Sequence, residues 1–420
     1  MAVVSPSASL LRPWSDLLPE LLGHIIAYLP FPGDRARLRA VCRGWRSAAR
    51  RHVRQLPWLV LPDASFCTIA ADGDDGCTSF FFRRGNIPGL PEDATIVGST
   101  GAWLAVDRTD DPRRDVNHRH SYLLHNPFSG ETVPLPELDD VIGHVSDKFE
   151  VRKVLMRSPS APADDVIAVM TNSCYCNVIL CHPGKGVEIL PYFGICDVAF
   201  LGDCLYGITA HEDLLIFELD GDEDDDDGDR PIVVNGGRVI KHPLADGEKD
   251  PWSWMDDNAG NGNGDGVDND GNDNDNLVSD GEDIGPYTEA PYQGHAITTR
   301  KLVVSQGGEL LMVRRLMQEP PFTRSFTREV KVFKADVDIG KWVPVDHDPL
   351  AQDEALFLSR AFSKCCQVFG DMKPGFMYFE DADEVFDTRL WTAMPFTIPW
   401  QRKLFRSEWT TWVFPPEVVV

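Results

Sequence analysis

The sequence predicts a small all-α unit at the N-terminus followed by an all-β domain, for which a β-propeller is the favoured architecture. Apolar residues repeat at helical spacing in residues 14–56, and short apolar runs between turn residues fill residues 58–400. A third observation is an acidic segment rich in Asp, Asn and Gly at residues 221–285. Its low apolar content predicts a long disordered insertion in the β domain.

The first helix is predicted by a single apolar stripe. Ser15 and Asp16 are capping residues, and Pro19 follows at a position where its missing amide hydrogen costs little. Pro30 and Pro32 are expected to end the helix. The apolar residues at helical spacing are Leu18, Leu21, Leu22, Ile25, Ile26 and Leu29.

A second helix is expected to start near Asp34. Its residues at helical spacing are Leu38, Val41, Cys42, Trp45, Ala48 and Ala49. Eight arginines between residues 34 and 54 lie on the other faces, which fits either a solvated face or an acidic protein partner. Nucleic acid is disfavoured because no stacking aromatic residues are interleaved with them. Two or three such helices form a very small core, so the unit is expected to gain stability by docking on a partner.

Two motifs stand out in this unit. The first comprises Leu18-Pro19-Glu20, Leu22, Ile25-Ile26 and Leu29-Pro30, and the second runs from Leu38 to Arg46 and contains Val41-Cys42-Arg43-Gly44-Trp45. The Leu-Pro start and the Val-Cys-x-x-Trp segment resemble the signature of an F-box. The resemblance implies docking on the Skp-type adaptor of a cullin-RING ubiquitin ligase. Carried over by position, the adaptor contacts are Leu18, Pro19, Leu22, Ile26, Val41 and Trp45; alternatively, these residues serve only the internal core of a helical hairpin.

The β domain is predicted by runs rich in Val, Ile, Phe and Tyr that recur between turn residues. Irregular repeats of about 40–60 residues with three or four strands favour a β-propeller over a packed pair of sheets. The candidate strands are Trp58–Leu61, Cys77–Phe82, Trp103–Val106, Ser121–Leu124, Val151–Met156, Val166–Met170, Val178–Cys181, Asp197–Leu201, Leu205–Ile208, Leu214–Leu219, Lys301–Val304, Leu310–Val313, Val330–Phe333, Leu356–Leu358 and Phe376–Phe379.

Two segments of the β domain indicate which kind of F-box protein the chain resembles. Asn126-Pro127 and Ser129-Gly130 are turn pairs in the run from Leu124 to Pro136. This run resembles the Asn-Pro-x-Thr-Gly…Leu-Pro element of plant F-box proteins with a kelch-like C-terminal domain of unknown function, with Ser129 in place of the commoner Thr. Residues 353–359 and 373–381 resemble the C-terminal pattern of that domain. The plant assignment depends on this resemblance alone.

The charge, the apolar runs and the cysteines of the sequence predict where in the cell the chain is located. The formal net charge is −26, and residues 220–283 alone hold 21 acidic against 4 basic residues. No removable leader is expected before Trp14, and no apolar run reaches the roughly 18–20 residues that span a bilayer. Ten cysteines without framework spacing indicate reduced thiols inside a cell. We therefore expect the nucleus or the cytoplasm, and no membrane partner.

Metal and catalytic sites are disfavoured. The best EF-hand register, from Asn261 to Asn272, begins with Asn and ends with Asn where a bidentate Glu is needed. Cys174, Cys176, Cys181 and His182 lack paired Cys-x-x-Cys knuckles and are interpreted as buried thiols. No nucleophile elbow, Walker loop or dinucleotide turn occurs in a supporting context. The acid pairs Asp139-Asp140 and Glu380-Asp381 are interpreted as solvated, so no catalytic residue, metal or cofactor is expected.

The leading hypothesis is a non-catalytic adaptor: the F-box docks on the ligase and the β domain binds an unknown target protein. One alternative is an F-box scaffold that works outside ubiquitin transfer. Another is a propeller hydrolase with incidental N-terminal helices, and a third is a chaperone that binds basic proteins through residues 220–283.

Overall fold

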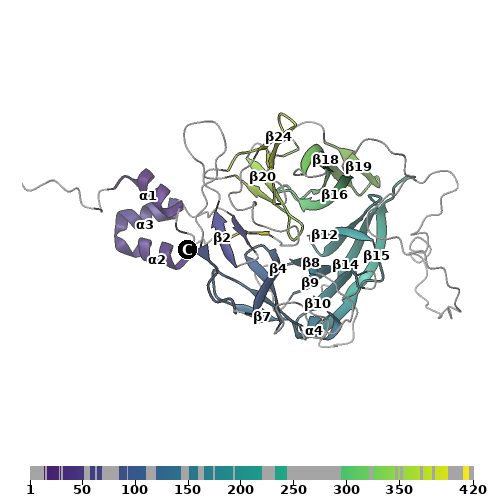
Figure 1. Ribbon diagram of the computed structural model, residues 1–420, viewed down its shortest axis with the longest axis horizontal. Helices are drawn as coiled ribbons and strands as arrows, with labels where there is room; N and C mark the ends of the chain where they lie inside the picture. The colour runs from purple at the N-terminus through teal and green to yellow at the C-terminus, as the bar shows by residue number, and fades with distance from the viewer. Residues whose placement is uncertain are drawn as a thin grey trace, which may run out of the picture.

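The computed structural model of the chain shows three N-terminal helices beside a ring of β-sheets (Figure 1). It describes residues 14, 17–27, 29, 32–51, 57–61, 64–68, 85–91, 93–109, 120–142, 151–158, 165–173, 176–192, 194–219, 232–243, 295–320, 325–345, 349–350, 353–368, 372–380, 384–395 and 410–415.

The N-terminal unit contains helices α1 (Pro19–Ala27), α2 (Pro32–Val41) and α3 (Arg43–Arg51). The predicted second helix is thus two helices that meet at Cys42, whose Sγ accepts a hydrogen bond from the Trp45 amide at 3.4 Å. The prediction that Pro32 ends the first helix is wrong. Pro32 is the first residue of α2, where its missing amide hydrogen leaves no helical bond unmade.

Six sheets form the blades of a β-propeller, which confirms the predicted architecture. Blade one contains β25 (Thr411–Val413), β1 (Trp58–Val60), β2 (Ser65–Thr68) and β3 (Gly85–Asn86). Blade two contains β4 (Ala94–Thr100), β5 (Trp103–Thr109), β6 (His120–His125) and β7 (Thr132–Pro134), and is followed by helix α4 (Pro136–Ile142). Blade three contains β8 (Val151–Met156), β9 (Ile167–Thr171), β10 (Val178–His182) and β11 (Gly186–Ile189).

The remaining blades follow in chain order. Blade four contains β12 (Ile195–Leu201), β13 (Cys204–Thr209), β14 (Leu214–Leu219) and β15 (Val233–Ile240). Blade five contains β16 (His295–Val304), β17 (Leu310–Glu319), β18 (Phe326–Asp336) and β19 (Lys341–Pro344). Blade six contains, in spatial order, β21 (Lys364–Gln367), β20 (Glu354–Leu358), β22 (Phe376–Phe379), β23 (Glu384–Asp387) and β24 (Thr392–Pro395), with β20 and β22 parallel.

In each blade, the strand named first above lies nearest the propeller axis. Strands β25, β4, β8, β12, β16 and β21 hold these inner positions, and neighbouring inner strands contact one another. Six hydrophobic clusters fill the six interfaces between adjacent blades. Because alternate side chains of a strand point to opposite faces, Leu302 packs toward blade four and Val303 toward blade six. Each blade is therefore apolar on both faces.

The ring closes through the C-terminal segment. Strand β25 pairs with β1, placing Trp58 opposite Val413 and Val60 opposite Thr411. Ser99 of blade two secures this strand, because its hydroxyl lies 2.6 Å from that of Thr411 and donates to the carbonyl of Trp412 at 2.7 Å. The β domain thus extends beyond residue 400, the boundary predicted from the sequence.

The predicted insertion boundary also changes. Residues 233–240 form strand β15, the outer strand of blade four, so the prediction that the insertion begins at 221 is wrong for this segment. The remainder of residues 221–285, including the EF-hand register at 261–272, lies largely outside the described residues. The candidate strand Cys77–Phe82 lies outside them as well, whereas every other candidate strand overlaps a strand of the structure.

Candidate functional site

The N-terminal unit has a core of only a few side chains. Leu22 and Ile26 of α1 are 2% and 1% exposed, and they pack with Leu38 of α2 and with Ala48 and Ala49 of α3. Residues four apart lie on one side of a helix, so this spacing turns one face of α1 inward. Such a small apolar area contributes little to the stability of the unit on its own.

A buried arginine closes the C-terminal end of α1. Arg35 of α2 donates from Nε to the carbonyl of Leu29 at 3.0 Å and from Nη2 to the carbonyl of Ile26 at 3.2 Å. These carbonyls lie at and just after the end of α1, where helical partners run out, and the Ile26 carbonyl also accepts the Leu29 amide at 3.0 Å. Burial lowers the pKa of Arg35 to about 10, so the guanidinium remains charged at neutral pH. The prediction that the arginines lie on the outer faces is wrong for Arg35, because the end of α1 needs an internal donor.

Three large apolar side chains at the start of the unit face solvent: Trp14, Leu18 and Leu21, which are 73%, 61% and 50% exposed. Leu18 and Leu21 are three residues apart and so lie side by side at the start of α1. The carbonyl of Trp14 accepts hydrogen bonds from the Trp45 indole at 3.1 Å and from the Leu17 amide at 3.4 Å, which holds Trp14 beside α3. We call Trp14, Leu18 and Leu21 the helical apolar surface. Exposed apolar side chains gathered in this way mark an interaction site.

The six residues predicted to contact an adaptor divide into two groups. Leu18, Pro19 and Val41 are exposed, and Trp45 is half-buried. Leu22 and Ile26 lie in the core, so the structure does not place these two side chains where a partner could reach them.

Sequence reasoning also missed two exposed residues, Trp14 and Leu21. Leu21 belongs to the predicted stripe, and its three-residue spacing from Leu18 was a usable signal. Trp14 carried no such signal, because a hydrogen bond to a residue 31 positions away holds it in place.

Three neighbouring inner strands of the propeller each carry a β-bulge near their start. The pairing of β4 shifts around Val97, that of β8 around Arg152 and that of β12 around Cys196. A bulge leaves one residue without a cross-strand partner and redirects its side chain. Cys196 is partly exposed to solvent, but desolvation by the surrounding atoms raises the pKa of its thiol, which is therefore protonated at neutral pH. A protonated thiol is a poor nucleophile.

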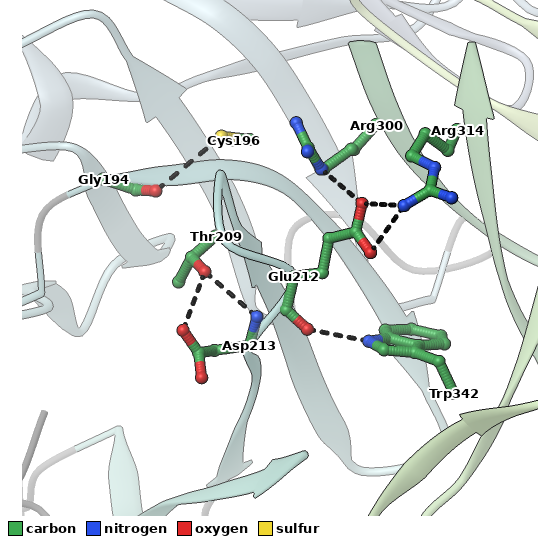
Figure 2. Close-up of polar contacts among 8 residues, drawn as sticks. All are labelled: Gly194, Cys196, Thr209, Glu212, Asp213, Arg300, Arg314 and Trp342. Atoms are coloured by element: carbon green, nitrogen blue, oxygen red, sulfur yellow. Dashed lines mark hydrogen bonds and ion pairs between the residues drawn. The ribbon is translucent and has the colours of Figure 1, made fainter. Parts of the chain in front are cut away.

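The carboxylate of Glu212 in blade four joins blades four and five (Figure 2). Glu212 lies in the turn between β13 and β14, and it accepts hydrogen bonds from Nε of Arg300 at 3.0 Å and from Nη1 of Arg314 at 2.9 and 3.1 Å. The Glu212 carbonyl accepts a fourth bond from the indole of Trp342 at 2.7 Å. The φ angle of Glu212 is 72°, a left-handed conformation unfavourable for Glu. We call these four residues the Glu212 clasp, and their contacts hold this strained residue in place.

The next residue, Asp213, secures the same turn from within. Its carboxylate accepts bonds from the Thr209 hydroxyl at 3.2 Å and the His242 amide at 3.0 Å, and lies 2.8 Å from Nδ1 of His242. Arg238 of β15 lies 3.6 Å away. The turn therefore ties β15 and the segment after it to the centre of blade four.

A buried ion pair joins blades three and four close to the bulges. Nζ of Lys153 donates to Asp197 at 2.6 Å and to the carbonyl of Val198 at 2.8 Å, and both charged side chains are buried. The second carboxylate oxygen of Asp197 accepts the Leu302 amide of blade five at 2.8 Å. Burial lowers the pKa of Lys153, while Asp197 opposes that shift. One carboxylate thus links three consecutive blades.

Comparison with known proteins identifies both parts of the chain. Residues 78–394 match the KIB1-4 beta-propeller family, and residues 14–54 match the F-box-like family. The chain belongs to the KIB1-4 beta-propeller family. Its helical unit is F-box-like, as the sequence motifs predicted, whereas the plant origin and the kelch-like type stay predictions.

Solved structures similar to this KIB1-4 propeller are distant. PorZ, an essential surface component of the type-IX secretion system of Porphyromonas gingivalis, is 9% identical, with a TM-score of 0.33, over 82% of this chain and 37% of its own. The N-terminal domain of Nup159 is 8% identical, with a TM-score of 0.28, over 69% of this chain and 61% of its own. The chain therefore spans less than two thirds of either relative. No curated protein matches it.

An F-box-like unit followed by a propeller is typical of non-catalytic adaptors. The interpretation of the acid pairs as solvated is wrong for Glu380, which is buried and accepts the Arg360 amide. Asp139 accepts the Tyr122 amide at 2.8 Å, and Asp381 lies outside the described residues. Cys176 and Cys181 are packed in the core between blades two and three. Among the described residues, no three His, Cys, Asp or Glu side chains converge as metal ligands, and no helix is long and apolar enough to cross a bilayer.

Proposed function

We propose that this KIB1-4 propeller is the substrate-recognition subunit of an SCF-type cullin-RING ubiquitin ligase. Its F-box-like unit docks on the Skp-type adaptor, and its propeller binds a target protein in the nucleus or cytoplasm. The observation that carries the proposal is the helical apolar surface, in which Trp14, Leu18 and Leu21 are exposed on a unit whose own core is very small.

The division of the α1 side chains supports this proposal. Leu22 and Ile26 satisfy the internal core, so Leu18 and Leu21 are left available for a second chain. Burying a leucine side chain contributes about 1.5–3 kcal/mol, so these two contacts can stabilise a complex by several kcal/mol. No bond chemistry is required of the chain itself. Tethering a target beside the ligase raises the effective concentration of its lysines near the charged ubiquitin-conjugating enzyme.

Adaptor capture by the full-length chain tests the docking step. The test variant combines Leu18→Arg with Leu21→Arg, both exposed positions, so the fold should tolerate the change. We expect adaptor affinity to fall by about a hundredfold, measured by calorimetry or by capture on an immobilised adaptor.

The matched control combines Leu390→Arg with Ile339→Arg. These positions are 67% and 60% exposed and follow strands β23 and β18 of the propeller, so the control also replaces two exposed aliphatic residues with arginine, but outside the helical unit. It should bind the adaptor like the wild type. Equal affinity of the test variant and the wild type would refute the proposed docking surface. Normal adaptor capture without ubiquitination of any propeller-bound protein would instead favour an F-box scaffold that works outside ubiquitin transfer.

A further inference from the structure

Cations gather near the starts of the inner strands of blades three and four and the middle of the inner strand of blade five. The charged groups that act on the Cys196 thiol are the cations Arg300, Lys301 and Arg152 and the carboxylate of Asp197. That carboxylate is already paired with Lys153 at 2.6 Å. Arg300 is likewise paired with Glu212 at 3.0 Å. With Lys153 included, four cations stand against the two carboxylates of Asp197 and Glu212, so the local excess is positive in a chain whose net charge is −26. We call Arg152, Arg300 and Lys301 the axial basic cluster.

These cations remain accessible. Arg152, Arg300 and Lys301 are each partly exposed, and Cys196 between them is exposed. Arg152 is the bulged residue of β8, and bulges beside binding sites redirect side chains. In the part of the chain that the structure describes, no acidic side chain pairs with Lys301.

A basic row continues from the cluster across blade five. Arg300 of β16 lies directly opposite Arg314 of β17, which lies opposite Lys331 of β18. Directly opposite side chains share one face of the sheet at a spacing of about 5 Å. Arg300 and Arg314 share the single carboxylate of Glu212, as Figure 2 shows. Lys331 is paired with Glu329 at 2.9 Å near the surface, where such a pair contributes little.

From this geometry we propose that the axial basic cluster, continued by the row on blade five, binds an acidic peptide segment of the target protein. This inference rests on the proposed function and specifies the class of target. A small anion would need cations that converge on one point, whereas Arg300, Arg314 and Lys331 extend the cluster along a line across three neighbouring strands. An extended peptide with successive carboxylates or phosphates matches such a line, and the positive cluster would also accelerate its association.

Fluorescence anisotropy with a labelled oligoglutamate peptide tests this inference on the full-length chain. The test variant combines Lys301→Glu with Arg152→Ala, neither of which belongs to the Glu212 clasp. Its dissociation constant should rise by about tenfold or more, and wild-type binding should weaken as salt is added. The control, Lys341→Glu, makes the same lysine-to-glutamate reversal at an exposed position on the outer strand β19 and should bind like the wild type.

Further probes distinguish the ligand classes. Unchanged oligoglutamate binding by the test variant would overturn the inference, as would equally tight binding of an oligoglutamine peptide. Tighter binding of a single-stranded oligonucleotide would reassign the surface to nucleic acid, and tighter binding of inorganic phosphate would reassign it to small anions. Adaptor capture is measured on the same samples. We expect the test variant to lose peptide binding while it still captures the adaptor. If instead the wild-type chain bound the peptide but captured no adaptor, the proposed function would be refuted and the peptide site would stand.

Discussion

Removal of the Glu212 carboxylate should weaken the junction between blades four and five. Glu212→Ala deletes three hydrogen bonds from two arginines and leaves both cations partly buried without their shared carboxylate. Bonds between charged groups contribute about 1.5–3 kcal/mol when shielded, but the Glu212 side chain is 18% exposed and its arginines are also partly solvated. We therefore expect a loss of about 2 kcal/mol in unfolding free energy.

The left-handed backbone of Glu212 gives this prediction a second arm. Glu212→Gly removes the same carboxylate but relieves the strain of a φ angle of 72°, which costs a non-glycine residue about 1 kcal/mol. The melting temperature should therefore fall most for Glu212→Ala, by about 4 °C, and by roughly half as much for Glu212→Gly. Thermal unfolding followed by tryptophan fluorescence measures both changes.

The control is Glu329→Ala, which breaks an exposed ion pair with Lys331 inside blade five. It should change the free energy of unfolding by less than about 0.5 kcal/mol. A double-mutant cycle of Glu212→Ala with Arg314→Ala should give a coupling energy of about 1 kcal/mol. If Glu212→Ala and Glu329→Ala were equally mild, or if the cycle showed no coupling, the clasp would not join the blades as described.

Three other perturbations have expected outcomes. Lys153→Met alone should destabilise the propeller by about 3–5 kcal/mol in urea unfolding because Asp197 loses its buried cation. Adding Asp197→Leu should recover only part of that loss, because the buried Leu302 amide then loses its acceptor. Arg35→Ala should lower both helical circular dichroism and adaptor capture, because the Leu29 carbonyl loses its Nε donor and the Ile26 carbonyl keeps only the Leu29 amide. Arg37→Ala at an exposed position should change neither. Burial raises the pKa of Cys181 from an ordinary value of 9.0 to about 12 in the folded chain. The contribution of this thiol to stability is therefore complete below about pH 9 and is lost as the pH rises toward 12. Cys181→Val should flatten the decline in melting temperature between these two pH values.

The fold was predictable where one strand holds enough apolar residues to be buried on both faces. Strand β9, for example, is buried along its whole length, and its run of Ile, Ala, Val and Met was recognisable in the sequence. Strand β15 was missed because Gly236 and Gly237 interrupt it and acidic runs flank it, so its average composition resembles a disordered segment. Strand β25 was missed for another reason: three residues carry little local signal, and only pairing with β1 at the far end of the chain makes them a strand.

The candidate sites were predictable where their residues are close together in the sequence and hidden where they are not. The helical unit could be located because its motif is contiguous, but periodicity alone could not separate the buried Leu22 from the exposed Leu21. The Glu212 clasp could not be predicted, since Glu212 contacts partners 88 and 102 positions away and no local pattern marks any of them. The axial basic cluster was equally hidden, because Arg152 belongs to blade three and Arg300 and Lys301 to blade five, and only the packing of the inner strands around β12 brings them together.

The short connection between the two parts of the chain limits how a bound target can be presented. Helix α3 ends at Arg51 and β1 begins at Trp58, so these residues can lie at most about 25 Å apart even with the chain fully extended. Strand β1 is also the strand that pairs with β25 to close the ring. Figure 1 shows the helices beside that side of the propeller. Under the proposed function, a ligase docked on the helices would therefore be held within this short distance of the closing blade. Such a connection would restrict the range of distances between the ligase and the target, and so raise the effective concentration of the target's lysines.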